Sequence, residues 1–144
     1  MPTFRSLNVR DSPGLLWAFC EHLHGNVLLS LEGDLSGLGL MELPSASNVE
    51  TATLKRQTAE PELDFCVIPV NIETLCTLKK KLALAGILGR NGQIIHVQIA
   101  KDNQLMLIAC DNFHPECTVA ADSVATAFLQ GLVQHGVLRS YHSG

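Results

Sequence analysis

The sequence predicts an α+β fold, a two-layer sandwich in which helices pack on one face of a sheet. The main observation is the order of hydrophobic patterns from residue 63 to residue 142, which runs strand, helix, strand, strand, helix, strand. The second observation is a two-residue turn between the two middle strands, which is typical of a hairpin. This order is that of the ferredoxin-like βαββαβ unit, whose helices share one sheet face.

Length and composition favour a single domain. The chain has 144 residues, of which 47% are hydrophobic and 17% are charged. That is long enough to bury a continuous core and too apolar for extensive disorder. We therefore expect one domain over 1–144, in which 1–62 form an N-terminal helix and strand extension that packs on the unit formed by 63–142.

The extension begins with a predicted helix. Ser12 is a candidate N-cap, Pro13 suits the first helical turn, and leucine and phenylalanine follow at helical spacing. Gly25 is a plausible stop, and residues 26–33 read as a short strand.

The segment 33–62 has no sustained periodicity, because glycine, proline and serine interrupt it. Within it, residues 49–57 alternate loosely and predict either an edge strand or a mobile excursion. Since bare loops of this length are uncommon in compact domains, we expect at least one strand here.

The βαββαβ unit starts with a predicted strand at 63–70. Pro69 near its end counts against a central position in the sheet, because proline cannot donate a ladder hydrogen bond. Asn71 is a candidate cap for a helix from residue 72 to about 87. The inner side of this helix is expected to carry Ile72, Leu75, Cys76, Leu82 and Ala83.

Two strands, 93–100 and 104–110, are predicted to form a hairpin across Asp102 and Asn103, residue types that tolerate positive φ. The last helix is expected to be capped by Asp122 or Ser123 and to end at Gly136. A final strand is predicted at 137–142.

The hairpin also predicts a register, with Ala100 opposite Leu105, Ile99 opposite Met106 and Val97 opposite Ile108. One face of the hairpin then belongs to the core, and the expected core residues are Ile95, Val97, Ile99, Met106, Ile108 and Cys110. The other face carries Ile94, His96, Gln98, Ala100, Leu105, Leu107 and Ala109. Because half of this second face is apolar, something should cover it. The candidates are the N-terminal helix and strand of the same chain, the same face of a second copy, and an apolar ligand.

Composition disfavours several functional classes. The net charge is −4, and the lysine run 79–81 is most simply a solvated helix surface, so nucleic acid is not expected as a partner. No apolar run approaches the roughly 20 residues of a membrane span, and the N-terminus lacks the apolar stretch of a secretory signal. Five scattered cysteines suit reduced thiols. We expect a cytoplasmic protein without a membrane partner or a cofactor.

The stretch 109–117, ACDNFHPEC, holds the densest group of chemically reactive side chains. One hypothesis is a zinc site, for which four N or S ligands are needed; the candidate set is Cys20, His24, His114 and Cys117. Another hypothesis is a catalytic site, in which Cys117 is a nucleophile and His114 its base; its candidate residues are Asp111, His114, Glu116 and Cys117. The simplest reading is a turn, since Asp, Asn and Pro are turn residues.

The leading functional hypothesis is a non-catalytic cytoplasmic binding protein. Its apolar sheet face would contact a protein partner or a second copy as a homodimer, with a small ligand as a further possibility. The residues expected at that contact are His96, Gln98, Leu105 and Leu107. The alternative is a small enzyme or metal-binding protein built around His114, Glu116 and Cys117.

Overall fold

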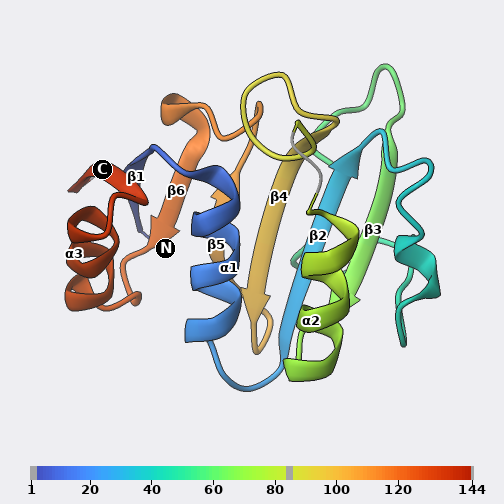
Figure 1. Cartoon of the computed structure of the whole chain (residues 1–144), viewed down its shortest axis with the longest axis horizontal. Helices are drawn as coiled ribbons and strands as arrows, with labels where there is room; N and C mark the ends of the chain where they lie inside the picture. Colours follow the sequence, from blue (N-terminus) through green and yellow to red (C-terminus); the bar gives the residue numbers. More distant parts are fainter. Residues whose placement is uncertain (1–2, 84–85, 144) are drawn as a thin grey trace.

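The computed structural model describes residues 3–83 and 86–143 and shows an α+β fold with one antiparallel sheet and three helices (Figure 1). The helices are α1 (Ser12–His22), α2 (Ile72–Lys81) and α3 (Thr126–Gln134). The strands are β1 (Phe4–Val9), β2 (Val27–Gly33), β3 (Asp64–Pro69), β4 (Ile94–Lys101), β5 (Gln104–Ala109), β6 (Thr118–Ala121) and β7 (Leu138–Ser143). Within the described ranges, no helix has the length and apolar character needed to cross a membrane.

The sheet is larger than the expected four strands, and its order is β3-β2-β4-β5-β6-β1-β7. The ferredoxin-like βαββαβ unit is therefore not formed. Strand β2 lies between β3 and β4, and strands β6 and β1 separate β5 from β7. Strand β3 ends at Pro69 and lies at an edge of the sheet, where a missing ladder donor is tolerated. Strands β1 and β2 of the predicted extension are inner strands of the same sheet.

The helices begin and end at different residues from those expected. Asp11, and not Ser12, caps α1, because its carboxylate accepts a hydrogen bond from the Gly14 N–H at 2.9 Å. Asn71 caps α2 as predicted, in a reciprocal capping box with Thr74. Helix α2 ends at Lys81, well before the expected end near residue 87; residues 84–85 lie outside the described residues.

The inner side of α2 also differs from the prediction. Ile72 is 91% exposed and Cys76 is exposed. Ala83 is exposed as well. Leu75 and Leu82 are buried as predicted, and Leu78 is also buried. These three residues follow the spacing i, i+3, i+7, which places them on one helical face.

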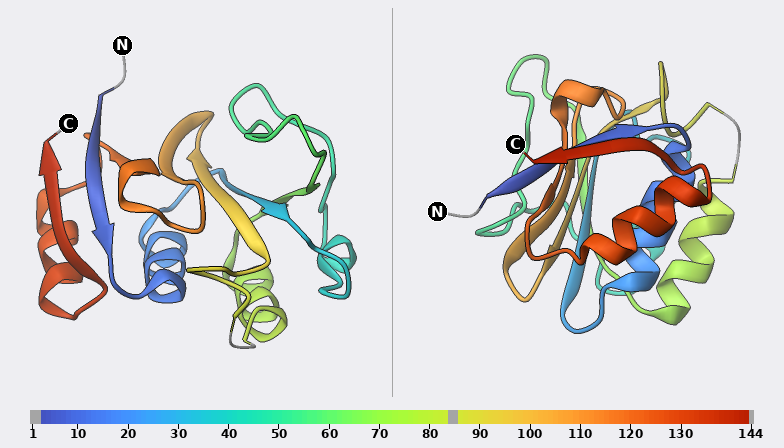
Figure 2. Two further views of the ribbon diagram at one scale, coloured as in Figure 1. Left: turned by 90° about the horizontal axis from the view of Figure 1, so that it is seen from above. Right: turned by 90° about the vertical axis from the view of Figure 1, so that its left-hand side faces the viewer.

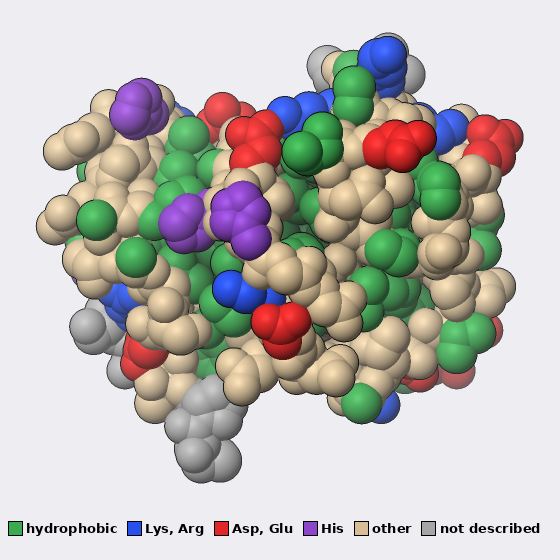
Figure 3. Space-filling view, turned by 90° about the horizontal axis from the view of Figure 1, so that it is seen from below, with side chains coloured by type: hydrophobic (Ala, Val, Ile, Leu, Met, Phe, Trp, Pro, Cys, Tyr) green, Lys and Arg blue, Asp and Glu red, His purple; other side chains and the backbone are tan. Residues whose placement is uncertain are grey.

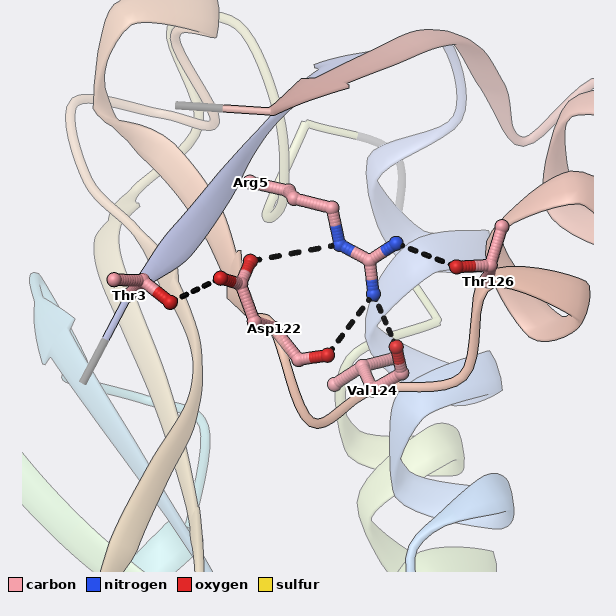
Figure 4. Close-up of polar contacts among 5 residues, drawn as sticks. All are labelled: Thr3, Arg5, Asp122, Val124 and Thr126. Carbon is pink, nitrogen blue, oxygen red and sulfur yellow. Dashed lines mark hydrogen bonds and ion pairs between the residues drawn. The ribbon is translucent and has the colours of Figure 1, made fainter.

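Arg5 of β1 holds the start of α3 in place (Figure 4). Its guanidinium donates to Thr126 Oγ1 at 2.8 Å and to the carbonyls of Asp122 and Val124. The Asp122 carboxylate pairs with Arg5 Nε at 3.7 Å and accepts a hydrogen bond from the Thr3 hydroxyl. Asp122 therefore does not cap α3, which begins later, at Thr126 and without a side-chain cap.

The hairpin turn is confirmed, since Asp102 and Asn103 have φ values of 50° and 65°. Ala100 pairs with Leu105 as predicted. A β-bulge follows, so that Ile99 pairs with Leu107 and Val97 with Ala109. The extra residue in β5 is Met106, and such a bulge reverses the facing of every residue beyond it.

The bulge corrects the assignment of the two faces. Leu107 and Ala109 are fully buried in the main core on the helix side. Cys110, expected in the core, is half-buried, and its Sγ lies 3.9 Å from Gln57 Oε1. A second register shift, at the end of β2, places Ile94 in the core in place of Ile95.

The segment between β2 and β3 passes from one side of the sheet to the other. Its first part packs on the helix side, where Leu40 and Leu43 join the main core, and its later part folds over the outer face, opposite the helices (Figure 2). We call residues 47–58 the strap. The strap contains no strand, only an isolated bridge between Ser47 and Val67 of β3, so the expected strand in this segment is wrong. Leu54 of the strap is fully buried in a small second core with Phe65, Val67 and Ala100.

Candidate functional site

The strap closes over a group of buried polar side chains on β2 and β4. Two of them, His96 and Gln98, were predicted as binding residues; the group consists of Ser30, Glu32, His96 and Gln98. Glu32 is only 2% exposed. Its carboxylate accepts hydrogen bonds from the backbone N–H groups of Gln57, at 2.7 Å, and Thr58, at 3.2 Å. These bonds from the strap compensate the desolvation of the carboxylate.

His96 joins the strap to the loop that follows β5. Its Nδ1 accepts a hydrogen bond from the Asp111 N–H at 3.2 Å, which assigns the ring proton to Nε2 in the neutral form. The Nε2–H then donates to Thr58 Oγ1 at 2.7 Å. Because both ring nitrogens are engaged within the chain, His96 fixes two loops and does not face solvent.

Gln98, like His96, connects the sheet to the strap. Its Oε1 accepts hydrogen bonds from the Lys55 N–H at 3.3 Å and from the Ser30 hydroxyl at 3.4 Å. The strap is therefore attached to the sheet by a row of polar contacts and by the apolar contact of Leu54. The strap thus covers this part of the outer face in place of the expected N-terminal helix and strand, which lie in the main core and in the sheet itself.

Part of the remaining outer face is a groove between the strap and β1, with a volume of about 740 Å³. Phe4, Leu105 and Ala121 provide its apolar lining, and Ala52 and Thr53 of the strap form one rim. Of the predicted binding residues, Leu105 is half-buried and lines this groove, whereas Leu107 lies in the core. Figure 3 shows the molecule from the end that carries the β4–β5 turn. Hydrophobic side chains lie at this surface among polar ones.

The reactive stretch after β5 forms a tight turn. Asp111, Asn112 and Phe113 have consecutive positive φ values of 49°, 56° and 64°. The Phe113 side chain is buried at the sheet end, and the Asn112 amide donates to the carbonyls of Gly92 and Ile94. These contacts give the turn a structural explanation that does not require a ligand.

The two thiols of this turn are held in their protonated form. Burial raises the pKa of Cys110 to about 11. Burial and the Asp111 carboxylate, whose Oδ2 lies 3.7 Å from the Cys117 Sγ, raise the pKa of Cys117. His114 Nδ1 accepts a hydrogen bond from the Glu116 N–H at 3.1 Å and caps the short turn Pro115–Cys117. Since the thiolate is the nucleophilic form, this environment disfavours a reactive cysteine.

The predicted metal ligands come from two regions. Cys20 and His24 line a groove at the C-terminal end of α1, whereas His114 lines a depression that includes Ser12, at the N-terminal end of the same helix. Eight residues of helix, about 12 Å, separate Ser12 from Cys20. In the ranges 3–83 and 86–143, no three His, Cys, Asp or Glu side chains are grouped so that they could hold a metal ion.

Sequence reasoning missed Glu32 and Ser30, which meet His96 and Gln98 across the β2–β4 pair. The information was present in the strand at 26–33, where the two polar residues alternate with leucines. That alternation indicates a polar face, but the partner that buries it, the strap, has no periodic pattern.

No family model, no curated protein and no solved structure matches the chain. Function therefore has to be inferred from the geometry of the chain itself.

Proposed function

We propose that the chain is a non-catalytic binding protein that contacts a second copy or another protein through the groove around Leu105. The observation that carries this proposal is an apolar surface beyond the strap. Leu105, Ile108 and Val119 lie on the outer side of β5 and β6 and are only half-buried. An antiparallel sheet face that meets water is normally polar, so an apolar one favours a contact.

The proposal includes a cytoplasmic location. The odd number of cysteines and their scatter along the chain suit a reducing compartment. The contacts of His114 and Cys117 support the non-catalytic part of the proposal, because His114 serves as a turn cap and the pKa of Cys117 is raised. His114→Ala and Cys117→Ala are expected to change stability without removing the association described next.

Sedimentation velocity over a range of protein concentrations tests whether the chain associates with a second copy through the groove. The wild-type chain is expected to pass from monomer to dimer as concentration rises. Leu105→Glu on the floor and Ala52→Glu on the exposed rim should both keep it monomeric, because each places a charge in the apolar contact. Ala127→Glu, at an exposed position of α3, is the matched control.

A wild-type chain that stays monomeric at its highest soluble concentration would contradict self-association and leave a different protein as the partner. Dimerisation that persists in both groove variants would place the contact elsewhere. Ala52 is exposed, so its variant also separates a lost contact from a lost fold.

A further inference from the structure

Three arginines from distant parts of the sequence line one depression at the N-terminal end of α1, on the upper edge of the molecule in Figure 1. Arg10 lies between β1 and α1, Arg90 in the loop before β4, and Arg139 in β7. The depression has a volume of about 540 Å³. Ser12 and His114 also line it. We propose that this depression binds a small organic phosphate.

The charges in the depression are unbalanced. In the described part of the chain, the ion pairs involve Arg5, Arg56, Lys79 and Lys81. No described carboxylate therefore lies within 4.0 Å of the guanidinium nitrogens of Arg10, Arg90 or Arg139.

One carboxylate belongs to the lining of the depression, that of Asp111, which accepts the Cys117 thiol. The side chains of the lining therefore sum to about two positive charges at neutral pH, although the whole chain has a net charge of −4. The neighbouring Asp11 carboxylate is engaged at the Gly14 N–H. A concave site lined by charges of one sign attracts ions of the opposite sign.

The loops that carry these side chains are fixed before any ligand arrives. The Asn112 amide donates to the carbonyls of Gly92, at 2.9 Å, and Ile94, at 3.1 Å. The Gly92 N–H donates to the Gly89 carbonyl at 2.9 Å and closes the turn that contains Arg90. A loop whose backbone is already ordered loses less conformational entropy when its side chains bind a ligand.

Neutral donors complete the depression. His114 accepts a hydrogen bond at Nδ1, so the neutral ring carries its proton on Nε2 and can donate it to a ligand. The Ser12 hydroxyl has no hydrogen bond to any other described residue and is a second donor at the start of α1.

The donor set indicates the chemical class of the ligand. Guanidinium groups form paired hydrogen bonds with phosphate oxygens, which lysine cannot match. A phosphate monoester at neutral pH carries close to two negative charges, which balances the charge of the lining. The volume exceeds that of a phosphate group, so an organic part fits beside it. Nucleic acid is a poorer match because the rest of the surface is acidic overall.

Isothermal titration calorimetry of the full chain with inorganic pyrophosphate at low salt tests the site. The wild-type chain is expected to bind it, and Arg90→Ala and Arg139→Ala should each weaken binding about tenfold. Arg90→Lys keeps the charge but loses the planar fork, so it should also weaken binding. Lys80→Ala, at an exposed position of α2, removes the same charge elsewhere and should leave binding unchanged.

Three results would overturn the proposal. The first is no binding heat from the wild-type chain up to about 10 mM pyrophosphate. The second is an equal loss of affinity in Lys80→Ala, which would indicate general charge attraction. The third is sulfate binding as tight as pyrophosphate binding, which would indicate an unspecific anion patch. Arg90 and Arg139 are exposed, and unchanged circular dichroism of their variants shows that folding is retained.

Discussion

The Glu32 carboxylate on β2 accepts a hydrogen bond from the backbone N–H of Gln57, 25 residues away in the strap, at 2.7 Å. The adjacent Thr58 N–H donates to the other carboxylate oxygen. A buried carboxylate thus serves as the anchor for a segment that has no regular secondary structure. The position of the strap decides which part of the outer sheet face stays open, so this contact governs the proposed binding surface.

Glu32→Gln is expected to loosen the strap. The substitution removes the charge and places an amide NH2 against one of the two backbone N–H donors, which leaves that donor unpaired. The free energy of unfolding should fall by about 2 kcal/mol, measured by urea denaturation. Trypsin should also cut faster after Lys55 and Arg56. Glu60→Gln, at an exposed position, is the control; equal cleavage rates in the two variants would contradict the anchor role.

Leu54→Ala should destabilise the protein although Leu54 lies in a loop. Its side chain is fully buried in the small outer core with Phe65 and Val67. Truncation leaves a cavity, and we expect a loss of about 3 kcal/mol. Val49→Ala, in the same strap but at a side chain that is 66% exposed, should change stability by less than about 0.5 kcal/mol. A similar small effect at Leu54 would show that the strap is not docked.

Arg5→Ala should be among the more damaging single substitutions. The substitution removes the guanidinium that donates hydrogen bonds to the carbonyls of Asp122 and Val124 and to the Thr126 hydroxyl. Because these groups lie where the chain enters α3, the free energy of unfolding should fall by about 3 kcal/mol. Thermal or chemical denaturation measures this fall. Arg139 on β7 is exposed, so Arg139→Ala should hardly change stability. Equal losses of stability in the two variants would refute the role of Arg5.

Stability should fall at alkaline pH, in part through Cys20. Burial, followed by the charge of Glu21, raises the pKa of its thiol from 9.0 to about 12. Below pH 9 the Cys20 thiol is protonated in both the folded and the unfolded chain, so its full contribution to the free energy of unfolding is present. As pH rises from 9 toward 12, the unfolded chain releases the proton and the folded chain keeps it, so stability is lost. At about pH 10.5 the titration of Cys20 alone should lower the free energy of unfolding by on the order of 2 kcal/mol.

Urea denaturation at about pH 8 and about pH 10.5 measures this loss. The difference between the two values should be smaller in Cys20→Ala than in the wild-type chain. Cys76→Ala, which changes an exposed thiol, should keep the full difference. An unchanged difference in Cys20→Ala would show that the thiol does not contribute.

The α+β class, α1, the Asn71 cap and the turn at Asp102 and Asn103 could be predicted because each depends on a local pattern. The strand order could not, because β1 and β6 lack a clear strand pattern. Strand β1 places a charged residue, Arg5, at a buried position, and β6 has four residues. Pro69 was the one local indication of an edge strand.

The candidate site was less predictable than the fold. A single extra residue at Met106 moved Leu107 from the outer face to the core, and no sequence pattern announces such a bulge. The strap contacts Glu32 and Gln98 through backbone N–H donors, and every residue except proline carries one. The arginines of the phosphate site lie too far apart in the chain to form a motif.

The most direct test of the proposed binding surface is methyl NMR with a soluble paramagnetic probe, at low and at high protein concentration. We predict that the probe broadens the Leu105 and Ile108 methyl signals at low concentration and that self-association shields them at high concentration. The Leu54 methyls should be shielded throughout, because the strap is docked. Leu105 and Ile108 signals that remain equally broadened at both concentrations would contradict self-association through this surface. Leu54 signals broadened as strongly as these would contradict the docked strap that defines the surface.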